Sequence, residues 1–171
     1  MAVRDILIIG HPMLAKKAEK VEKIDDGLIQ LARDMVETMH KAPGIGLAAP
    51  QVNDGRRLIT IDLSVGEKEA DLIVLANPEI VARDGEAVSE EGCLSVPDIR
   101  EKVARPYRVT LKGVNLDGRE VVIEGEDLLA RVICHEVDHL DGKLFTDRLS
   151  PLKKNLLRKK LKKATETGFK L

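Results

Sequence analysis

The residues with the clearest chemical pattern occupy positions 135–139, where the sequence reads His-Glu-Val-Asp-His. Residues four apart in a helix lie on one face, so His135 and His139 can direct their imidazoles at one metal ion. Glu136 lies about 100° further round the helix, where it can reach a water molecule bound to that ion. Alternatively, the two histidines could have a purely structural role in the core, but the intervening glutamate favours a hydrolytic metal site.

A catalytic metal site needs a third protein ligand and leaves one position for water. The candidates are His11, His40, Cys93, Cys134 or a carboxylate. Cys134 is adjacent to His135 and faces away from the shared helical face. Cys93 follows Gly92, which permits a close approach of the backbone. Spacing alone leaves an inert buried cysteine as an equally good interpretation of Cys93.

Small residues dominate a third segment, Gly-Ile-Gly-Leu-Ala-Ala-Pro-Gln at positions 44–51. Such a segment either packs tightly or lets a ligand lie against its backbone. Its last residue, Gln51, has an amide that can donate a hydrogen bond to an oxyanion without adding charge. A simple turn that ends a helix is the alternative. No Lys-Ser/Thr pair follows, which argues against a phosphate loop.

The face that carries the two histidines continues toward the start of the same predicted helix. Leu128 and Val132 precede His135 by seven and three positions and fall on its stripe. The ion would therefore lie beside an apolar pocket, which suits an apolar side chain of the substrate.

Three helices are expected to position these residues. Asp25 or Asp26 caps the first, which has one apolar face and ends at Pro43-Gly44. The second runs from about Asp127 to Asp141, with Gly142 as its stop. The third begins at Pro151 and reaches about Lys163, with its leucines on one stripe. Those leucines are Leu152, Leu156, Leu157 and Leu161.

Short segments rich in β-branched residues lie between the first two helices. Asp117-Gly118 is a strong hairpin signal because both residues tolerate positive φ. Grouped strands indicate an α+β fold, with mostly antiparallel sheets around a central metal-binding helix and helices near both termini. Nothing marks a boundary, so residues 1–171 are expected to form a single catalytic domain. The expected strands are Arg57–Leu63, Leu72–Ala76, Glu79–Arg83, Arg108–Asn115 and Arg119–Ile123.

Composition and charge exclude several classes of protein. The 171 residues include 28 Lys+Arg, 29 Asp+Glu and two cysteines, so the chain needs no disulfide to build a core. No apolar run approaches the roughly 20 residues of a membrane span, and the start lacks a secretion signal. We expect a cytoplasmic protein with no membrane partner. After Ser150, eight basic residues and one glutamate indicate either docking to an anionic partner or a solvated helix face.

The segments GIGLAAPQ (44–51), EGCLS (91–95) and HEVDHL (135–140) together resemble the signature segments of the peptide deformylase family, in order. The resemblance covers nearly the whole chain. It implies a metal-dependent hydrolase that removes the formyl group from the N-terminal formyl-methionine of nascent polypeptides and releases formate. It also implies that Cys93, His135 and His139 bind one divalent ion, with Fe(II) expected and Zn, Ni or Co possible in a preparation.

The resemblance also implies roles for other residues. Glu136 would act as acid and base, while the Gln51 side chain and the Leu94 backbone N–H would stabilise the oxyanion. The small Gly46 would let the substrate backbone pair like an added strand. Our candidates for the methionine pocket are Ile45, Leu128 and Val132.

This sequence departs from the family pattern at two positions of the central helix. Cys134 stands where glutamine is common, which leaves the ligands intact. Arg131 stands where an apolar residue is expected, which predicts a more polar edge to the pocket. The basic C-terminal helix resembles the segment with which bacterial members dock at the ribosome, where it would meet RNA phosphates.

Two other functions fit parts of the sequence. A metallopeptidase would also use the His-Glu-x-x-His pattern, but its third ligand is usually a downstream His or Glu, and no histidine follows His139. A ribosome-associated binding module would keep the fold and lose turnover. The presence of both Glu136 and Gln51 argues against that module.

Overall fold

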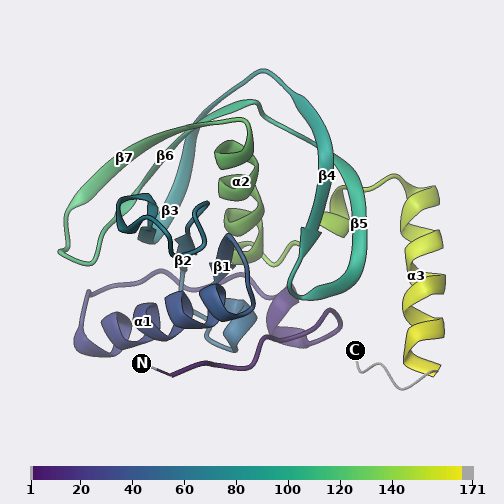
Figure 1. Cartoon of the computed structure of the whole chain (residues 1–171), viewed down its shortest axis with the longest axis horizontal. Coiled ribbons are helices and arrows are strands. Elements are labelled where there is room, and N and C mark those ends of the chain that lie inside the picture. The colour runs from purple at the N-terminus through teal and green to yellow at the C-terminus, as the bar shows by residue number, and fades with distance from the viewer. Residues whose placement is uncertain (1, 167–171) are drawn as a thin grey trace.

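The computed structural model describes residues 2–166 of the chain, with side chains described through residue 162. Five strands form an antiparallel sheet in the order β1-β2-β3-β6-β7, and β4 and β5 form a separate antiparallel hairpin (Figure 1). The central helix α2 lies between them. The strands are β1 (Gly46–Ala48), β2 (Leu58–Ile61), β3 (Ile73–Asp84), β4 (Ala87–Cys93), β5 (Val96–Arg105), β6 (Arg108–Val114) and β7 (Glu120–Glu126).

Within residues 2–166, three α-helices and four short 3₁₀ helices complete the fold, and the α+β prediction is confirmed. The side chain of Asp25 caps the first helix by accepting a hydrogen bond from Leu28 N at 2.9 Å. The helices are α1 (Asp26–Lys41), α2 (Leu128–Leu140), α3 (Pro151–Glu166), η1 (Pro12–Ala15), η2 (Ala49–Val52), η3 (Glu69–Asp71) and η4 (Phe145–Arg148). None of the helices in the described part of the chain has the length and apolar character needed to span a bilayer.

Helix α2 packs its apolar residues against the five-stranded sheet. Ala130 and Ile133 join Ile59, Leu75 and Leu111 from three strands in one buried cluster. The helix ends where predicted, because Gly142 adopts φ +75° and lies too close to the Ala15 carbonyl for any side chain. The buried face of α2 therefore fixes the direction in which its histidines point.

Helix α1 covers another part of the sheet. Its predicted apolar face is buried against β1 and β2, next to the segment that leads from α1 into β1. The members of this face are Leu28, Leu31, Ala32, Met35 and Met39.

The β4–β5 hairpin lies on the side of α2 opposite the five-stranded sheet. It forms a small core of its own with η4 and α3. Leu157 and Leu161 of α3 pack into this core. Leu152 and Leu156 are 70% and 51% exposed, so the prediction of one buried leucine stripe is wrong for these two residues. Figure 1 shows α3 standing at the side of the molecule, beside the hairpin β4–β5.

The structure also corrects the predicted strands. The two segments expected at Leu72–Ala76 and Glu79–Arg83 are one strand, β3, whose register shifts between Ala76 and Glu79. Asn77 lies at this irregularity with φ +51°. The hairpin β4–β5 carries Cys93 and was absent from the predicted strands.

Candidate metal centre

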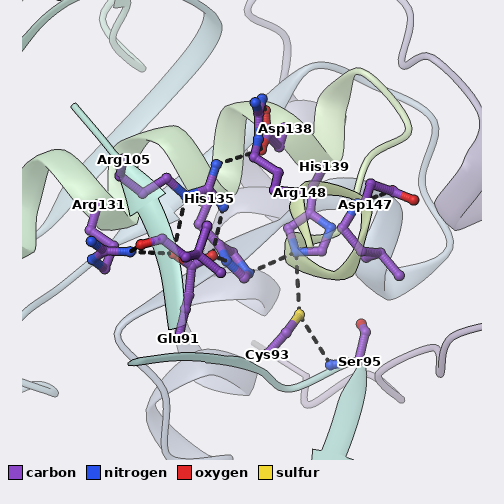
Figure 2. A network of polar contacts seen from close by, with 12 residues as sticks. Glu91, Cys93, Ser95, Arg105, Arg131, His135, Asp138, His139, Asp147 and Arg148 are labelled. Carbon is purple, nitrogen blue, oxygen red and sulfur yellow. Dashed lines mark hydrogen bonds and ion pairs between the residues drawn. The ribbon is translucent and has the colours of Figure 1, made fainter. Parts of the chain in front are cut away.

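Three side chains from two distant parts of the chain converge beside α2. Cys93 comes from the end of β4, and His135 and His139 come from successive turns of α2 (Figure 2). Their ligand atoms all lie within 4.8 Å of one another. Cys93 Sγ is 3.4 Å from His139 Nε2, which is 3.2 Å from His135 Nε2.

The separations and chemistry of these atoms fit a metal ion. Atoms that share a tetrahedral ion at bond lengths of about 2.1 Å lie about 3.4 Å from one another. Burial lowers the pKa of His139 well below its ordinary value. The neutral form of the ring is therefore favoured, which leaves a nitrogen lone pair for a cation.

The ring of His135 is oriented by a carboxylate. Its Nδ1 lies 2.7 Å from Glu91 Oε2. Burial acts to raise the pKa of Glu91, but hydrogen bonds from His135 and Arg105 outweigh it and lower that pKa to about 2. An ionised Glu91 holds the proton on Nδ1, so Nε2 is the atom left to face a metal.

Two buried arginines hold Glu91 in turn. Arg105 contacts both carboxylate oxygens, at 3.1 and 2.6 Å, and Arg131 contacts Oε1 at 3.1 Å. Arg131 also donates to the carbonyls of Ala87 and Val103 on the β4–β5 hairpin. Its guanidinium therefore joins α2 to the hairpin, a role that no local sequence pattern indicates.

Glu136 is buried beside the strand β1. Its Oε1 atom has no hydrogen-bond partner among the described residues. A Cβ atom at Gly46 would collide with its carboxylate and approach Val132 Cγ1 to 3.0 Å. Burial raises the pKa of Glu136 to about 7, against the opposing effect of His135. A carboxyl group with such a pKa is suited to exchange protons at neutral pH.

The amide of Gln51 lies next to Cys93, one of the three candidate ligand residues. Its Oε1 accepts a hydrogen bond from Ala48 N at 2.9 Å, which fixes the orientation of the amide. Its Nε2 donates to Ser95 Oγ at 3.1 Å and lies 3.7 Å from Cys93 Sγ. Leu94 lies between Cys93 and Ser95, where β4 turns into β5.

A cavity of about 440 Å³ opens next to Glu136 and His135. This volume lies within the usual range for sites that bind small ligands. The four residues predicted to bind substrate all line it: Ile45, Gly46, Leu128 and Val132. Arg131 and Arg100 line it as well, and Arg100 belongs to none of the sequence motifs.

The other candidates for a third ligand have different surroundings. His11 caps η1 by accepting a hydrogen bond from Met13 N, and His40 lies 2.7 Å from Asp62. Cys134 is buried in the apolar cluster under α2. The structure therefore brings only Cys93, among these alternatives, to the two histidines of α2 within the described residues.

Hydrolysis of an amide by water at a metal ion is the chemistry that this arrangement supports, which defines a metallohydrolase on an α+β fold. The chain belongs to the polypeptide deformylase family, whose profile matches residues 3–155. It is thus a metal-dependent hydrolase, with one catalytic metal ion, that removes the formyl group from the N-terminal methionine of nascent polypeptides.

Individual relatives match over nearly their full lengths. Peptide deformylase of Acidobacterium capsulatum is 48% identical over 168 residues, which cover 98% of this chain and 99% of that protein. Peptide deformylase 1 of Clostridium acetobutylicum is 52% identical over 88% of this chain and 97% of its own. The crystal structure of a peptide deformylase from Legionella pneumophila has a TM-score of 0.90 at 46% identity, covering 97% of each chain.

Proposed function

We propose that Cys93, His135 and His139 hold the catalytic metal ion and that this ion is Fe(II). The observation that carries the proposal is the convergence of one sulfur and two ring nitrogens within 4.8 Å. This donor set also suits Zn, Ni or Co, so these ions are expected to occupy the site in some preparations. When bound, the ion supplies a Lewis acid that makes water reactive at neutral pH.

Glu136 moves the protons of the reaction. Its unpaired Oε1 accepts a proton from the attacking water, and the same carboxyl then delivers a proton to the leaving amine. Water adds to the formyl carbon and the C–N bond then breaks, so the products are formate and a free N-terminal amine. The close approach of Gly46 supports this role, because it lets the Glu136 carboxylate pack against β1 at the cavity.

Gln51 and Leu94 stabilise the negative charge that develops on the formyl oxygen. The Gln51 amide is anchored at its oxygen by Ala48 N, and its NH₂ group faces the Cys93 sulfur. Leu94 offers a backbone N–H from the residue that follows Cys93. Donors fixed before the reaction need no reorganisation when charge appears.

The substrate chain pairs with β1. This strand lies at the edge of the five-stranded sheet, so its outer side is available for an added strand. Gly46 begins β1 and lines the cavity. Main-chain pairing tolerates different residues after methionine, whose own side chain enters the cavity between Ile45, Leu128 and Val132.

The basic helix α3 docks on the ribosome, and the chain acts in the cytoplasm as one catalytic domain. Nascent formylated chains emerge from the ribosome, and the exposed cations of α3 suit RNA phosphates. Those exposed residues include Arg158, Lys159, Lys160 and Lys162. Neutralising them should weaken sedimentation with ribosomes at low salt, and unchanged binding would refute docking through α3.

The activity is tested with anaerobically prepared, metal-replete protein. The substrates are formyl-Met-Ala-Ser, acetyl-Met-Ala-Ser and a longer peptide with internal amide bonds. We expect formate from the first peptide and no cleavage of the other two. Cleavage within the longer peptide would instead indicate a metallopeptidase, and absence of formate would contradict the proposed chemistry.

A further inference from the structure

We propose that Arg148, which lies outside all three sequence motifs, is a positioning residue for the metal centre and acts on His135 through Asp138, Arg105 and Glu91. The proposal rests on the proposed role of His135 as a ligand. Arg148 is the last residue of η4, the short helix that precedes the C-terminal helix α3. The inference therefore assigns a part of the metal site to the C-terminal segment.

The first link joins Arg148 to α2. Its Nε and Nη2 atoms lie 2.8 and 2.7 Å from the two carboxylate oxygens of Asp138. Two parallel hydrogen bonds from a planar guanidinium fix the orientation of a carboxylate more strictly than one ammonium group can. Asp138 immediately precedes His139, on the turn of α2 that separates the two proposed histidine ligands.

The second link leads into the interior. Asp138 Oδ2 lies 2.7 Å from Arg105 Nη1, and the same guanidinium reaches Glu91 through its Nε and Nη2 atoms. Arg105 is 2% exposed, so water cannot readily replace either carboxylate. Glu91 completes the path at His135 Nδ1, as Figure 2 shows.

Arg105 thus donates hydrogen bonds to two carboxylates, Asp138 and Glu91. Arg148 affects how strongly each of them attracts the Arg105 guanidinium. With Arg148 in place, both oxygens of Asp138 have a donor of their own, and Arg105 keeps its two bonds to Glu91. Without Arg148, Asp138 Oδ1 loses its donor and Arg105 becomes the main partner of Asp138. The guanidinium is then drawn away from Glu91, which loosens the carboxylate that orients His135.

A separate contact places η4 against the same ligand. The ring of Phe145, at the start of η4, stacks on the ring of His135 with centroids 6.3 Å apart and planes inclined by 23°. The Asp147 carboxylate accepts a hydrogen bond from Leu144 N at 2.8 Å, which holds the beginning of η4. The two ends of this short helix therefore meet the metal-binding helix at Phe145 and Arg148.

The test compares Arg148→Gln with the wild type and with Arg108→Gln as a matched control. Arg108 pairs with Glu126 on the surface of the sheet, and both side chains are about half exposed. Each protein is loaded with Co(II), and metal release to excess chelator is followed together with the visible absorption spectrum. Removing the direct hydrogen-bond partner of a metal ligand typically changes metal affinity 10–100-fold. Arg148 acts on His135 through other residues, so we expect a smaller effect: Arg148→Gln should release cobalt about fivefold faster and change the visible spectrum.

A second variant, Arg148→Lys, keeps the charge and loses the planar fork. We expect its release rate to fall between those of the wild type and Arg148→Gln, with circular dichroism confirming that both variants are folded. A lower melting temperature with unchanged release rate and spectrum would reduce Arg148 to a structural residue and overturn the proposal. Failure of the wild type to bind one equivalent of Co(II) would instead overturn the ligand assignment, and this inference with it.

Discussion

The sulfur of Cys93 lies 3.4 Å from Nε2 of His139, although 46 positions separate the two residues. The sheet, the hairpin β4–β5 and helix α2 must all form before these atoms can meet. The geometry therefore depends on the whole fold, while the chemistry depends on a few side chains.

The two cysteines provide a matched pair of variants. Cys93→Ala removes the proposed sulfur ligand, and we expect metal affinity to fall by at least about 100-fold, more than the loss of an outer-shell partner costs. Cys134→Ala alters a buried residue of the apolar cluster under α2 and should keep a full equivalent of metal. Elemental analysis after dialysis measures both. Equal metal content in the two variants would place the third ligand elsewhere.

Glu136→Gln separates proton transfer from metal binding. The amide has nearly the same shape as the carboxyl group but cannot accept the proton of water, so we expect kcat to fall by about 10²–10⁴. Metal content should stay unchanged. Glu124→Gln, on the exposed side of β7, serves as the control and should keep wild-type activity. A Glu136→Gln enzyme with near-normal formate release would refute the acid and base role.

A single methyl group at Gly46 tests the close approach of β1 to α2. Its Cβ would collide with the Glu136 carboxylate and press on Val132. We expect Gly46→Ala to lower kcat at least about tenfold, because misplaced catalytic groups lose much of their effect. Gly27→Ala is the control, since its Cβ would meet only Asp25 Oδ1 at 3.5 Å. If both variants retain full activity, Glu136 does not need this close packing against β1.

The attachment of the N-terminal segment to α1 should depend on pH. Burial acts to raise the pKa of Asp34, but hydrogen bonds from Ala2 N, Gln30 and Arg4 outweigh it, and the net pKa is lowered. A lowered folded-state pKa contributes stability above the unfolded-state value of about 4, and this contribution is lost as pH falls through the folded-state pKa.

Asp34→Asn should therefore lower the free energy of unfolding by about 1–2 kcal/mol at neutral pH. The difference between the metal-free variant and the metal-free wild type should shrink as the pH falls below about 4. Denaturant titrations across this range measure it. A difference that stays constant with pH would show that the ionised form of Asp34 contributes nothing.

The helices could be predicted from sequence because their signals are local. The apolar face of α1, the cap at Asp25 and the stop at Gly142 each depend on neighbouring residues. The hairpin β4–β5 has no such signal, because much of both strands is exposed and charged residues occupy many of its positions. Pro78 next to Asn77 made one continuous strand look like two, since proline usually interrupts a sheet.

The candidate site likewise has parts with a local sequence signal and parts without one. Spacing within one helix predicts that His135 and His139 share a face, and resemblance to the family added Cys93. The partners of Glu91 were beyond prediction, because buried arginines are rare and Arg105 and Arg131 reach it from β5, which was not predicted, and from α2, 40 residues away. Contacts between charged residues far apart in sequence produce no periodic sequence pattern from which they could be predicted.

X-ray absorption at the edge of the bound metal tests the ligand set most directly. For anaerobically loaded protein, we predict one sulfur and two imidazole nitrogens in the first coordination sphere, with oxygen completing it. Loss of the sulfur scattering in Cys93→Ala would assign it to that residue. A first coordination sphere of the wild-type metal that contains no sulfur, or fewer than two imidazoles, would contradict this ligand set.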